Sequence, residues 1–229
     1  MKAEGLLAHY ARIADAPDAI ARLRRFVLGL AVRGKLISQD PTDEDVTELV
    51  GRISEDRTVA TQTGVLKEIS KIPSEATLNF SVPKGWRVMP LPAVVYFQEG
   101  PGLRNWQFRP SGVPFLNIRT LQDGRVNRDL CQFLSQEEVD QKYQHFLVGA
   151  GDILCSTSGT IGKLAVATEA DLPLMLNTSI VRFRAYGSNG PAQGFIKLFL
   201  ATDLFLTQAA AHVTGAAQVN MGPSHLRKL

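Results

Sequence analysis

Apolar side chains recur every three or four positions near the start of the chain, a spacing that predicts amphipathic helices. In the segment DAIARLRRFVLGLAVRGKL, one helical face carries Ile20, Leu23, Val27 and Leu30. Asp18 can cap the start of this helix, and Gly34 can end it. A second helix, in DEDVTELVGRI, carries Val46, Leu49, Val50 and Ile53 on one face. Such faces pack on each other or on the next domain, or they are offered to another subunit, and the pattern allows both interpretations.

From Trp86 onward the pattern changes to short β-leaning runs separated by turn residues. These runs predict strands over 113–118, 152–155, 163–168 and 179–183. Between them, 135–143 is expected to be a helix capped by Ser135, and 194–211 a longer helix. Strands mixed with helices, without a regular βαβ rhythm, predict an α+β fold. We expect a helical segment over 1–60, a connector over 61–84 and a mixed α/β domain with a twisted sheet over 85–229.

Composition and charge limit the possible size class, binding partners and cellular location of the protein. The 229 residues suit one large domain or one domain with an appendage, and the net charge of +3 is too small to indicate nucleic acid by itself. Cys131 and Cys155 fit a reducing cytoplasm better than a disulfide framework. No signal peptide and no apolar run of about 18–20 residues is present. The composition therefore predicts a cytoplasmic protein without a membrane segment.

The stretch GDILCSTSGTIGKLAVA, residues 151–167, is the first candidate for chemistry. A phosphate-binding Walker loop would need a glycine at Thr157 and a hydroxyl at Leu164, so the match fails twice. The dinucleotide fingerprint fails at Leu154, where its third glycine belongs. The stretch is therefore not a nucleotide loop.

A serine–lysine hydrolase is a second interpretation, with Ser156 or Ser158 as nucleophile and Lys163 as base. It would need a desolvated lysine within hydrogen-bonding reach of the hydroxyl, and nothing in the sequence identifies an oxyanion hole. The histidines (His9, His145, His212 and His225) are scattered, so zinc-ligand spacing is absent. We expect no catalytic residue, no metal and no cofactor.

A structural interpretation explains the stretch better. DILCS predicts a strand that enters a tight turn, SGTIG supplies glycines for positive φ, and KLAVA predicts the returning strand. Asp152 and the hydroxyls can bond local backbone amides. The expected scaffold residues are Gly151, Asp152, Ser156, Ser158, Gly159 and Gly162. Lys163 at the tip can contact a phosphate backbone.

The pattern G-D-I-L-x-S-x-S-G-x-I-G-K over 151–163 resembles the hallmark of target-recognition domains in specificity subunits of type I restriction–modification systems. Five further segments resemble that family in the same order: LRRFVLGLAVRGKLISQDPTDE (23–44), VPKGWRVMPL (82–91), GVPFLNIRTLQDGRVN (112–127), LNTSIVRF (176–183) and VTGAAQVNMGPSHLRKL (213–229). Each segment alone is degenerate, but six in the family's order are specific.

The resemblance implies a non-catalytic module that reads one part of a split double-stranded DNA target. It further implies that the conserved N-terminal helices hold the modification (methyltransferase) subunits, which restriction subunits join. The face formed by Ile20, Leu23, Val27 and Leu30 is then a partner-binding surface. A full specificity subunit has two recognition domains, whereas this chain has one. We therefore expect an N-terminal half whose recognition domain is truncated at its C-terminal end, either a shortened chain or a half-subunit. A recognition domain serving a fused restriction–methyltransferase enzyme is the alternative, against which the N-terminal helices argue.

Given this resemblance, DNA contact requires cations for phosphates and bidentate side chains for base edges. The richest window, GPGLRNWQFRPSG, offers Arg104, Asn105, Gln107 and Arg109. Its Trp106 and Phe108 are either part of the contact or core anchors. A second cluster, around the turn QDGR, contains Arg119, Arg125 and Arg128. A third contains Arg182 and Arg184, which alternate on a strand and share one face.

Overall fold

The computed structural model describes residues 18–187, 193–211 and 221–229. Its helices are α3 (Ala19–Ala31), α4 (Val46–Gln62), α5 (Leu91–Val94), α6 (Gln136–Glu138), α7 (Gln193–Leu200), α8 (Asp203–Ala211) and α9 (Pro223–Leu226). Its strands are β1 (Val95–Glu99), β2 (Val113–Phe115), β3 (Leu121–Gln122), β4 (Arg125–Val126), β5 (Gln132–Leu134), β6 (Ile153–Ser156), β7 (Leu164–Val166) and β8 (Ile180–Ala185). Helices combined with antiparallel sheets confirm the predicted α+β class.

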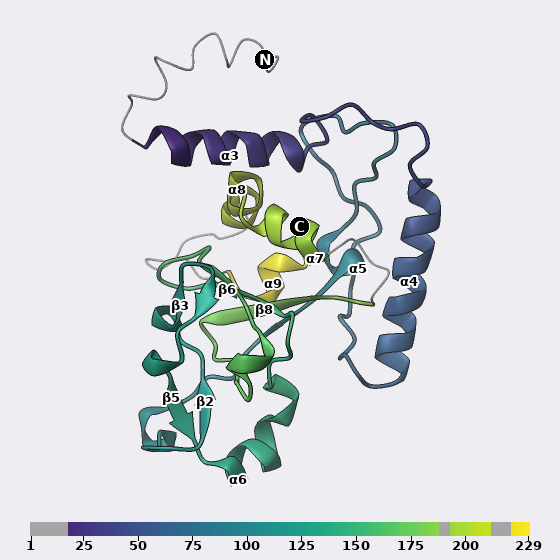
Figure 1. Cartoon of the computed structure of the whole chain (residues 1–229). Coiled ribbons are helices and arrows are strands. Elements are labelled where there is room, and N and C mark those ends of the chain that lie inside the picture. The colour runs from purple at the N-terminus through teal and green to yellow at the C-terminus, as the bar shows by residue number, and fades with distance from the viewer. Residues whose placement is uncertain (1–17, 188–192, 212–220) are drawn as a thin grey trace.

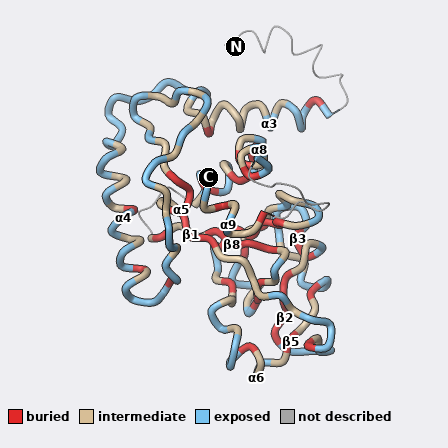
Figure 2. Tube along the Cα trace, turned by 180° about the vertical axis from the view of Figure 1, so that it is seen from behind, coloured by how far each residue is buried: buried red, intermediate tan, exposed pale blue. Residues whose placement is uncertain are grey.

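A four-stranded sheet in the order β1-β8-β6-β7 forms the centre of the molecule, and every pair in it is antiparallel (Figure 1). One face of the sheet carries Phe97, Val181 and Phe183, which pack with Leu200 and Phe205 of the C-terminal helices. The opposite face packs with the segments around β3 and 172–176. All four residues of β6 are buried, because this strand has a neighbour on each side and a layer on each face (Figure 2).

Two smaller antiparallel pairs extend the structure. β2 pairs with β5, and this pair lies with α6 at the end of the molecule away from α3 (Figure 1). β3 pairs with β4 across Asp123 and Gly124, whose φ values are 48° and 78°. Positive φ at both central residues is the geometry of a tight two-residue hairpin, so the turn expected at QDGR is confirmed.

The second N-terminal helix packs on the part of the chain that contains the sheet. α4 starts after Asp45, whose carboxylate accepts a hydrogen bond from the Thr47 amide at 2.7 Å. The buried Ile53 of α4 lies in one apolar cluster with Tyr96 of β1 and with Tyr186. For this helix the structure therefore supports packing on the next domain, the first of the two interpretations.

The first N-terminal helix is much less covered. α3 lies across the top of the view in Figure 1, beside α8. Ile20 is 69% exposed, whereas Leu23, Val27 and Leu30 are half-buried. The predicted cap is wrong: Asp18 has a φ of 61° and its side chain makes no capping bond. Gly34, with a φ of 66°, follows the last helical turn as expected.

Residues within and just after the segment expected to be a connector contact the segment between α3 and α4. The indole Nε1 of Trp86 donates to Oε1 of Gln39 at 2.7 Å. The guanidinium of Arg33 lies 5.2 Å from the Phe80 ring, a cation–π distance. A Cβ on Gly34 would lie 2.6 Å from Pro83, so only glycine fits this crossing. The boundary between the helical segment and the connector, expected at residue 60, also lies later, because α4 continues to Gln62.

The expectation of one long helix over 194–211 is wrong, because α7 and α8 are separate and meet at 65°. The hydroxyl of the buried Thr202 donates to the Phe199 carbonyl at 2.6 Å and accepts from the Phe205 amide at 3.4 Å. The hydroxyl therefore provides a hydrogen-bond partner for a backbone carbonyl at the end of α7 and for a backbone amide at the start of α8. By length and composition, no single described helix could cross a membrane, and only this bent pair passes that test.

The other expected elements are present with altered bounds. Ser135 caps α6 by accepting from the Glu138 amide at 3.2 Å, and a π-helix then continues to Tyr143. The strand expected over 113–118 ends at Phe115, because 118–120 form a 3-10 helix. Strand β1 was not predicted at all.

Candidate nucleic-acid interface

The stretch over 151–167 folds as a hairpin, as predicted. β6 and β7 pair through Cys155 and Leu164, and the turn between them contains Gly159 and Gly162 with φ values of 61° and 85°. The amide of Gly162 donates to the carbonyl of Ser156 at 3.0 Å, which closes the turn. Gly151, at the entry to β6, also has a positive φ of 85°. Three backbone positions that disfavour side chains therefore shape this hairpin.

Ser156 holds the turn and is not a nucleophile. Its buried hydroxyl donates to the Thr160 carbonyl at 2.5 Å and accepts from the Lys163 amide at 2.9 Å. Lys163 itself is exposed, whereas a catalytic lysine base needs a desolvated site. Ser158 is half-buried and makes no side-chain hydrogen bond in the described part of the chain. The serine–lysine hydrolase interpretation therefore has no support.

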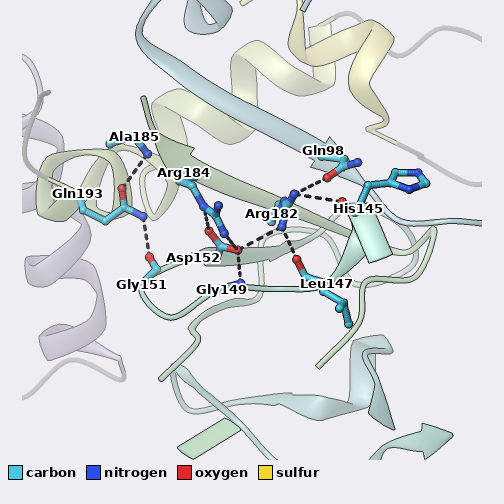
Figure 3. A network of polar contacts seen from close by, with 10 residues as sticks. All are labelled: Gln98, His145, Leu147, Gly149, Gly151, Asp152, Arg182, Arg184, Ala185 and Gln193. Carbon is cyan, nitrogen blue, oxygen red and sulfur yellow. Dashed lines mark hydrogen bonds and ion pairs between the residues drawn. The ribbon is translucent and has the colours of Figure 1, made fainter. Parts of the chain in front are cut away.

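Asp152 is the centre of a buried polar network behind this hairpin (Figure 3). Its carboxylate is fully buried and accepts from Nε and Nη2 of Arg184 at 2.5 and 2.7 Å, and from the Gly149 amide at 2.8 Å. This hydrogen-bonded ion pair raises the pKa of the Arg184 guanidinium above its ordinary value. The expected bond from Asp152 to a local amide is confirmed, and the paired arginine is additional.

Arg182 faces the same network from β8 (Figure 3). Its guanidinium donates to the carbonyls of Leu147 and His145 at 2.5 and 3.3 Å and to Oε1 of Gln98 at 2.6 Å. A fourth interaction joins it to Asp152, with nitrogen and oxygen 3.5 Å apart. Arg182 is 5% exposed.

The expectation that Arg182 and Arg184 share one face of a strand is met, but this face points into the protein. Arg182 cannot reach DNA without losing its internal partners, so we exclude it from the candidate interface. Arg184 retains 31% side-chain exposure, but its Nε and Nη2 bond to Asp152, so it keeps only part of the binding capacity expected for it. A buried carboxylate requires such cations, and the sequence alone does not reveal which ones it takes.

Gln193 at the start of α7 joins the hairpin to the C-terminal helices (Figure 3). Its side-chain amide donates to the Gly151 carbonyl at 2.6 Å, and its oxygen accepts from the Ala185 amide at 3.0 Å. The network therefore fixes the entry of β6, the end of β8 and the start of α7 relative to one another. Gln193 and Gln98 are site residues that the sequence interpretation missed, since their partners lie far away along the chain.

The hairpin tip brings one group of cations together. Gly159 approaches Ile118, because a Cβ on Gly159 would lie 3.3 Å from Cδ1 of that residue. An open groove of about 460 Å³ is lined by Lys163, Leu164 and the β3–β4 turn, 121–124. Arg119 follows Ile118 in the chain, and Arg125 follows the β3–β4 turn, whose Gly124 pairs with Ala165 of β7. Arg119, Arg125 and Lys163 are exposed, and within the described residues their side chains make no hydrogen bond or ion pair.

Arg128 is placed differently from these three. Although exposed, it donates from Nη1 to the carbonyls of Ala170 and Leu172 at 3.0 and 3.3 Å. Its remaining donors face outward, so it keeps only part of the binding capacity expected for it.

The loop over 100–112 forms a second candidate surface at the β2–β5 end of the molecule. Gln107 is buried: its Oε1 accepts from the Arg104 amide at 2.8 Å, and its Nε2 donates to Glu138 at 2.6 Å. We therefore exclude Gln107 from base contact. Phe108 packs on Phe115 with ring centroids 5.0 Å apart, as a core anchor should. Trp106, in contrast, is 75% exposed.

The remaining polar residues of this loop point outward. Arg104, Asn105 and Arg109 are exposed. Nη1 of Arg109 donates to the carbonyls of Trp106 and Phe108, each at 3.0 Å. This leaves the other guanidinium donors of Arg109 for a ligand.

The two thiols and the acidic residues offer no other chemistry in the described part of the chain. Burial raises the pKa of Cys131 to about 11 and that of Cys155 to about 12, which keeps both thiols protonated and unreactive. Among the described residues, no group of three or more His, Cys, Asp or Glu side chains could hold a metal ion. His9 and His212 lie outside these residues.

Comparison with known proteins identifies the class to which this arrangement is related. No family model matches the chain. Curated relatives do match it, and they are specificity subunits of type I restriction enzymes. The relationship to type I specificity subunits indicated by the sequence motifs is therefore confirmed.

Two relatives from Escherichia coli illustrate the extent of the match. The chain is 26% identical over 217 residues to the type I restriction enzyme EcoAI specificity subunit, which covers 89% of this chain and 36% of that protein. It is 33% identical over 132 residues to the EcoEI specificity subunit, which covers 57% of this chain and 22% of that protein. The chain thus spans about a third or less of the length of these two relatives.

Two solved structures align with parts of the chain. A chain from a type I restriction–modification system complex aligns with a TM-score of 0.48 and 16% identity, covering 93% of this chain and 46% of that chain. The HsdS subunit of Thermoanaerobacter tengcongensis aligns with a TM-score of 0.43 and 15% identity, covering 80% of this chain and 43% of that one.

Proposed function

We propose that the chain is a DNA-recognition module of a type I restriction–modification complex, which reads one part of a split double-stranded target. The observation that carries the proposal is the set of exposed cations at the hairpin tip, namely Arg119, Arg125 and Lys163. Lys163 ends the β6–β7 turn, Arg125 follows the β3–β4 turn, and Arg119 lies in the 3-10 helix that precedes β3. Exposed cations suit phosphate contact, which positions a protein on DNA.

The second part of the proposal assigns base contact to the loop over 100–112. Arg104, Asn105 and Arg109 are exposed there, and Arg109 retains free guanidinium donors. Arginine pairs with guanine and asparagine with adenine through bidentate hydrogen bonds. In this proposal the loop discriminates between base sequences, and the phosphate contacts of the hairpin tip fix the position of the protein along the DNA.

The proposed partners are modification subunits, which would dock on the N-terminal helices, and through them restriction subunits. The chain itself then contributes recognition and no bond-breaking chemistry. Three apolar residues on and just after α3 are exposed, Ile20, Leu36 and Ile37, and exposed apolar surface of this kind supports a contact at this end. A cytoplasmic location goes with this role and stays a prediction.

The test has two steps. First, the chain is co-expressed with a modification subunit of the same system, and co-purification is measured. Second, binding to duplex DNA is measured with and without that subunit. Lys163→Ala should weaken binding severalfold and equally for all sequences, as loss of a phosphate contact does.

Lys197→Ala is the matched control, since Lys197 is exposed on α7, among the helices on the other face of the sheet. It should leave binding unchanged. Equal loss of binding in both variants would mean that overall charge, and not the hairpin tip, attracts the DNA.

A further inference from the structure

Trp106 is unusual because it is a large aromatic side chain held in the open by a rigid loop. It is 75% exposed, while Gln107, the next residue, is buried. In the part of the chain that the structure describes, no aromatic ring or cation packs against its indole. Leaving an indole in water forgoes burial of a large apolar surface, which favours a contact that this structure does not contain.

The loop is braced on both sides of Trp106. The Gln107 side chain is buried and bonds to the Arg104 amide, Glu138 and the Tyr143 hydroxyl at 2.8, 2.6 and 3.3 Å. The guanidinium of Arg109 bonds to the carbonyl of Trp106 itself at 3.0 Å. A short 3-10 helix, Asn105–Gln107, includes the tryptophan. The indole is therefore presented on a preformed loop, and little backbone freedom would be lost when a ligand binds.

The neighbours of the indole indicate the kind of ligand. Arg104, Asn105 and Arg109 are exposed on the same loop, and no acidic residue occurs between Gly100 and Gly112. The carboxylate of Glu138, which contacts the loop, accepts a hydrogen bond from the Gln107 side chain. Cations around a projecting aromatic ring fit a polyanion with flat apolar surfaces, which describes nucleic acid.

We propose that Trp106 contacts the bases or sugars of bound duplex DNA through its apolar ring, between the cationic side chains of Arg104 and Arg109. This inference rests on the proposed function and adds a non-ionic contact to it. An apolar side chain can pack on a base edge or insert partly at a base step, and neither contact releases counterions.

The first measurement follows the two tryptophans directly. The chain contains two, Trp86 and Trp106, so labelling with 5-fluorotryptophan gives two fluorine resonances, which Trp106→Phe assigns. Titration with a mixed-sequence duplex at low salt should shift the Trp106 resonance. Trp86 is the internal control, since its indole is bonded to Gln39 and packs edge-on against Phe195 at 5.8 Å. Its resonance should stay in place.

The second measurement separates an apolar contact from an ionic one. Trp106→Ala should lower affinity by about tenfold at every salt concentration, which leaves the slope of log K against log salt unchanged. Lys163→Ala is the control, because loss of its proposed phosphate contact should make that slope shallower by about one. Trp106→Phe should retain most of the affinity, because it keeps an aromatic ring.

Three outcomes would overturn the inference. If the chain binds DNA while the Trp106 resonance stays unmoved and Trp106→Ala keeps full affinity, the inference fails and the proposed function stands. If the Trp106 resonance stays in place when DNA is added but moves when a modification subunit is added without DNA, Trp106 is a protein contact instead. If the chain binds no duplex at any salt concentration, alone or with that subunit, both proposals fail together.

Discussion

Asp152 is a buried carboxylate surrounded by donors from separate segments of the chain. It bonds to Arg184 and to the Gly149 amide and lies 3.5 Å from a nitrogen of Arg182. A buried charge is tolerated only when it is paired and hydrogen-bonded, so the carboxylate and the two cations depend on one another. Asp152, the Asp of the G-D-I-L pattern, therefore influences DNA binding only by holding the hairpin in position.

Asp152→Asn should lower the free energy of unfolding by about 3 kcal/mol or more, because two cations lose their buried counter-charge. Urea unfolding followed by circular dichroism measures this difference. Asp129→Asn is the control: Asp129 is exposed and makes no ion pair in the described residues, so its change should stay below about 0.5 kcal/mol. Equal stability of the two variants would show that the network does not stabilise the fold.

The limits of sequence interpretation are plain at the residue scale. Alternation predicted correctly that Arg182 and Arg184 share a face, but it could not tell that this face is internal, because burial depends on 145–152. Gln107 looked like a base-reading amide, and its partners Glu138 and Tyr143 lie more than thirty positions away. Trp106 and Phe108 looked equivalent, yet one is exposed and the other packs in the core. Only long-range contacts separate such residues.

At the scale of elements, local chemistry could be predicted well. The 151–167 hairpin, the QDGR turn and the Ser135 cap depend on residues within a few positions of each other, and all three are confirmed. Strand β1 was missed because its pairing partner, β8, lies more than eighty residues later. The break between α7 and α8 was missed because one hydroxyl, on Thr202, ends a continuous apolar pattern.

Gly162→Val should disrupt the β6–β7 turn. Gly162 has a φ of 85°, which a β-branched residue resists, and a new Cβ would lie 2.9 Å from the Leu206 side chain of α8. We expect a melting temperature lower by several degrees, measured by differential scanning fluorimetry, and a loss of DNA binding only as a consequence. Gly159→Val should cost less, since its Cβ would meet only the flexible end of Ile118 at 3.3 Å.

Gly102→Val is the matched control for both variants. A Cβ at Gly102 would meet no other atom within 4 Å, and the φ of this residue is not positive, so the melting temperature should not change. A turn that tolerates valine at position 162 would contradict the role of this glycine in shaping the hairpin.

The exposed face of α3 carries the prediction about partners. Leu23 and Leu30 are half-buried, so charges there could unfold the protein and confuse the result. Ile20 is 69% exposed and is the better probe. Ile20→Asp should weaken co-purification with the modification subunit while the melting temperature stays constant. Ala21→Asp, which adds the same charge at the neighbouring exposed position, should have the smaller effect. If Ile20→Asp assembles normally, this part of α3 is not the contact.

The whole molecule places its two candidate DNA surfaces apart. The hairpin tip lies at the β3 end of the sheet, and the 100–112 loop belongs to the β2–β5 end (Figure 1). Buried residues concentrate in the sheet between them, which makes it a firm connection (Figure 2). Because the sheet holds the two surfaces apart, one duplex can contact the hairpin tip through its phosphates and the 100–112 loop through its bases. The same arrangement gives the isolated chain only a few contacts with DNA.

Binding by the isolated chain should therefore be weak, nearly independent of sequence and strongly dependent on salt. Three exposed cations of the hairpin tip, Arg119, Arg125 and Lys163, are the proposed phosphate contacts and set the scale. About three phosphate contacts give a slope of log K against log salt of roughly −2.7, so affinity should fall by about fortyfold between 50 and 200 mM salt. Fluorescence anisotropy with a labelled duplex measures this slope. A modification subunit that encloses the same DNA should add contacts and bring out sequence preference, because linked sites bind together. Tight, sequence-specific binding by the chain alone at physiological salt would show that one recognition domain suffices.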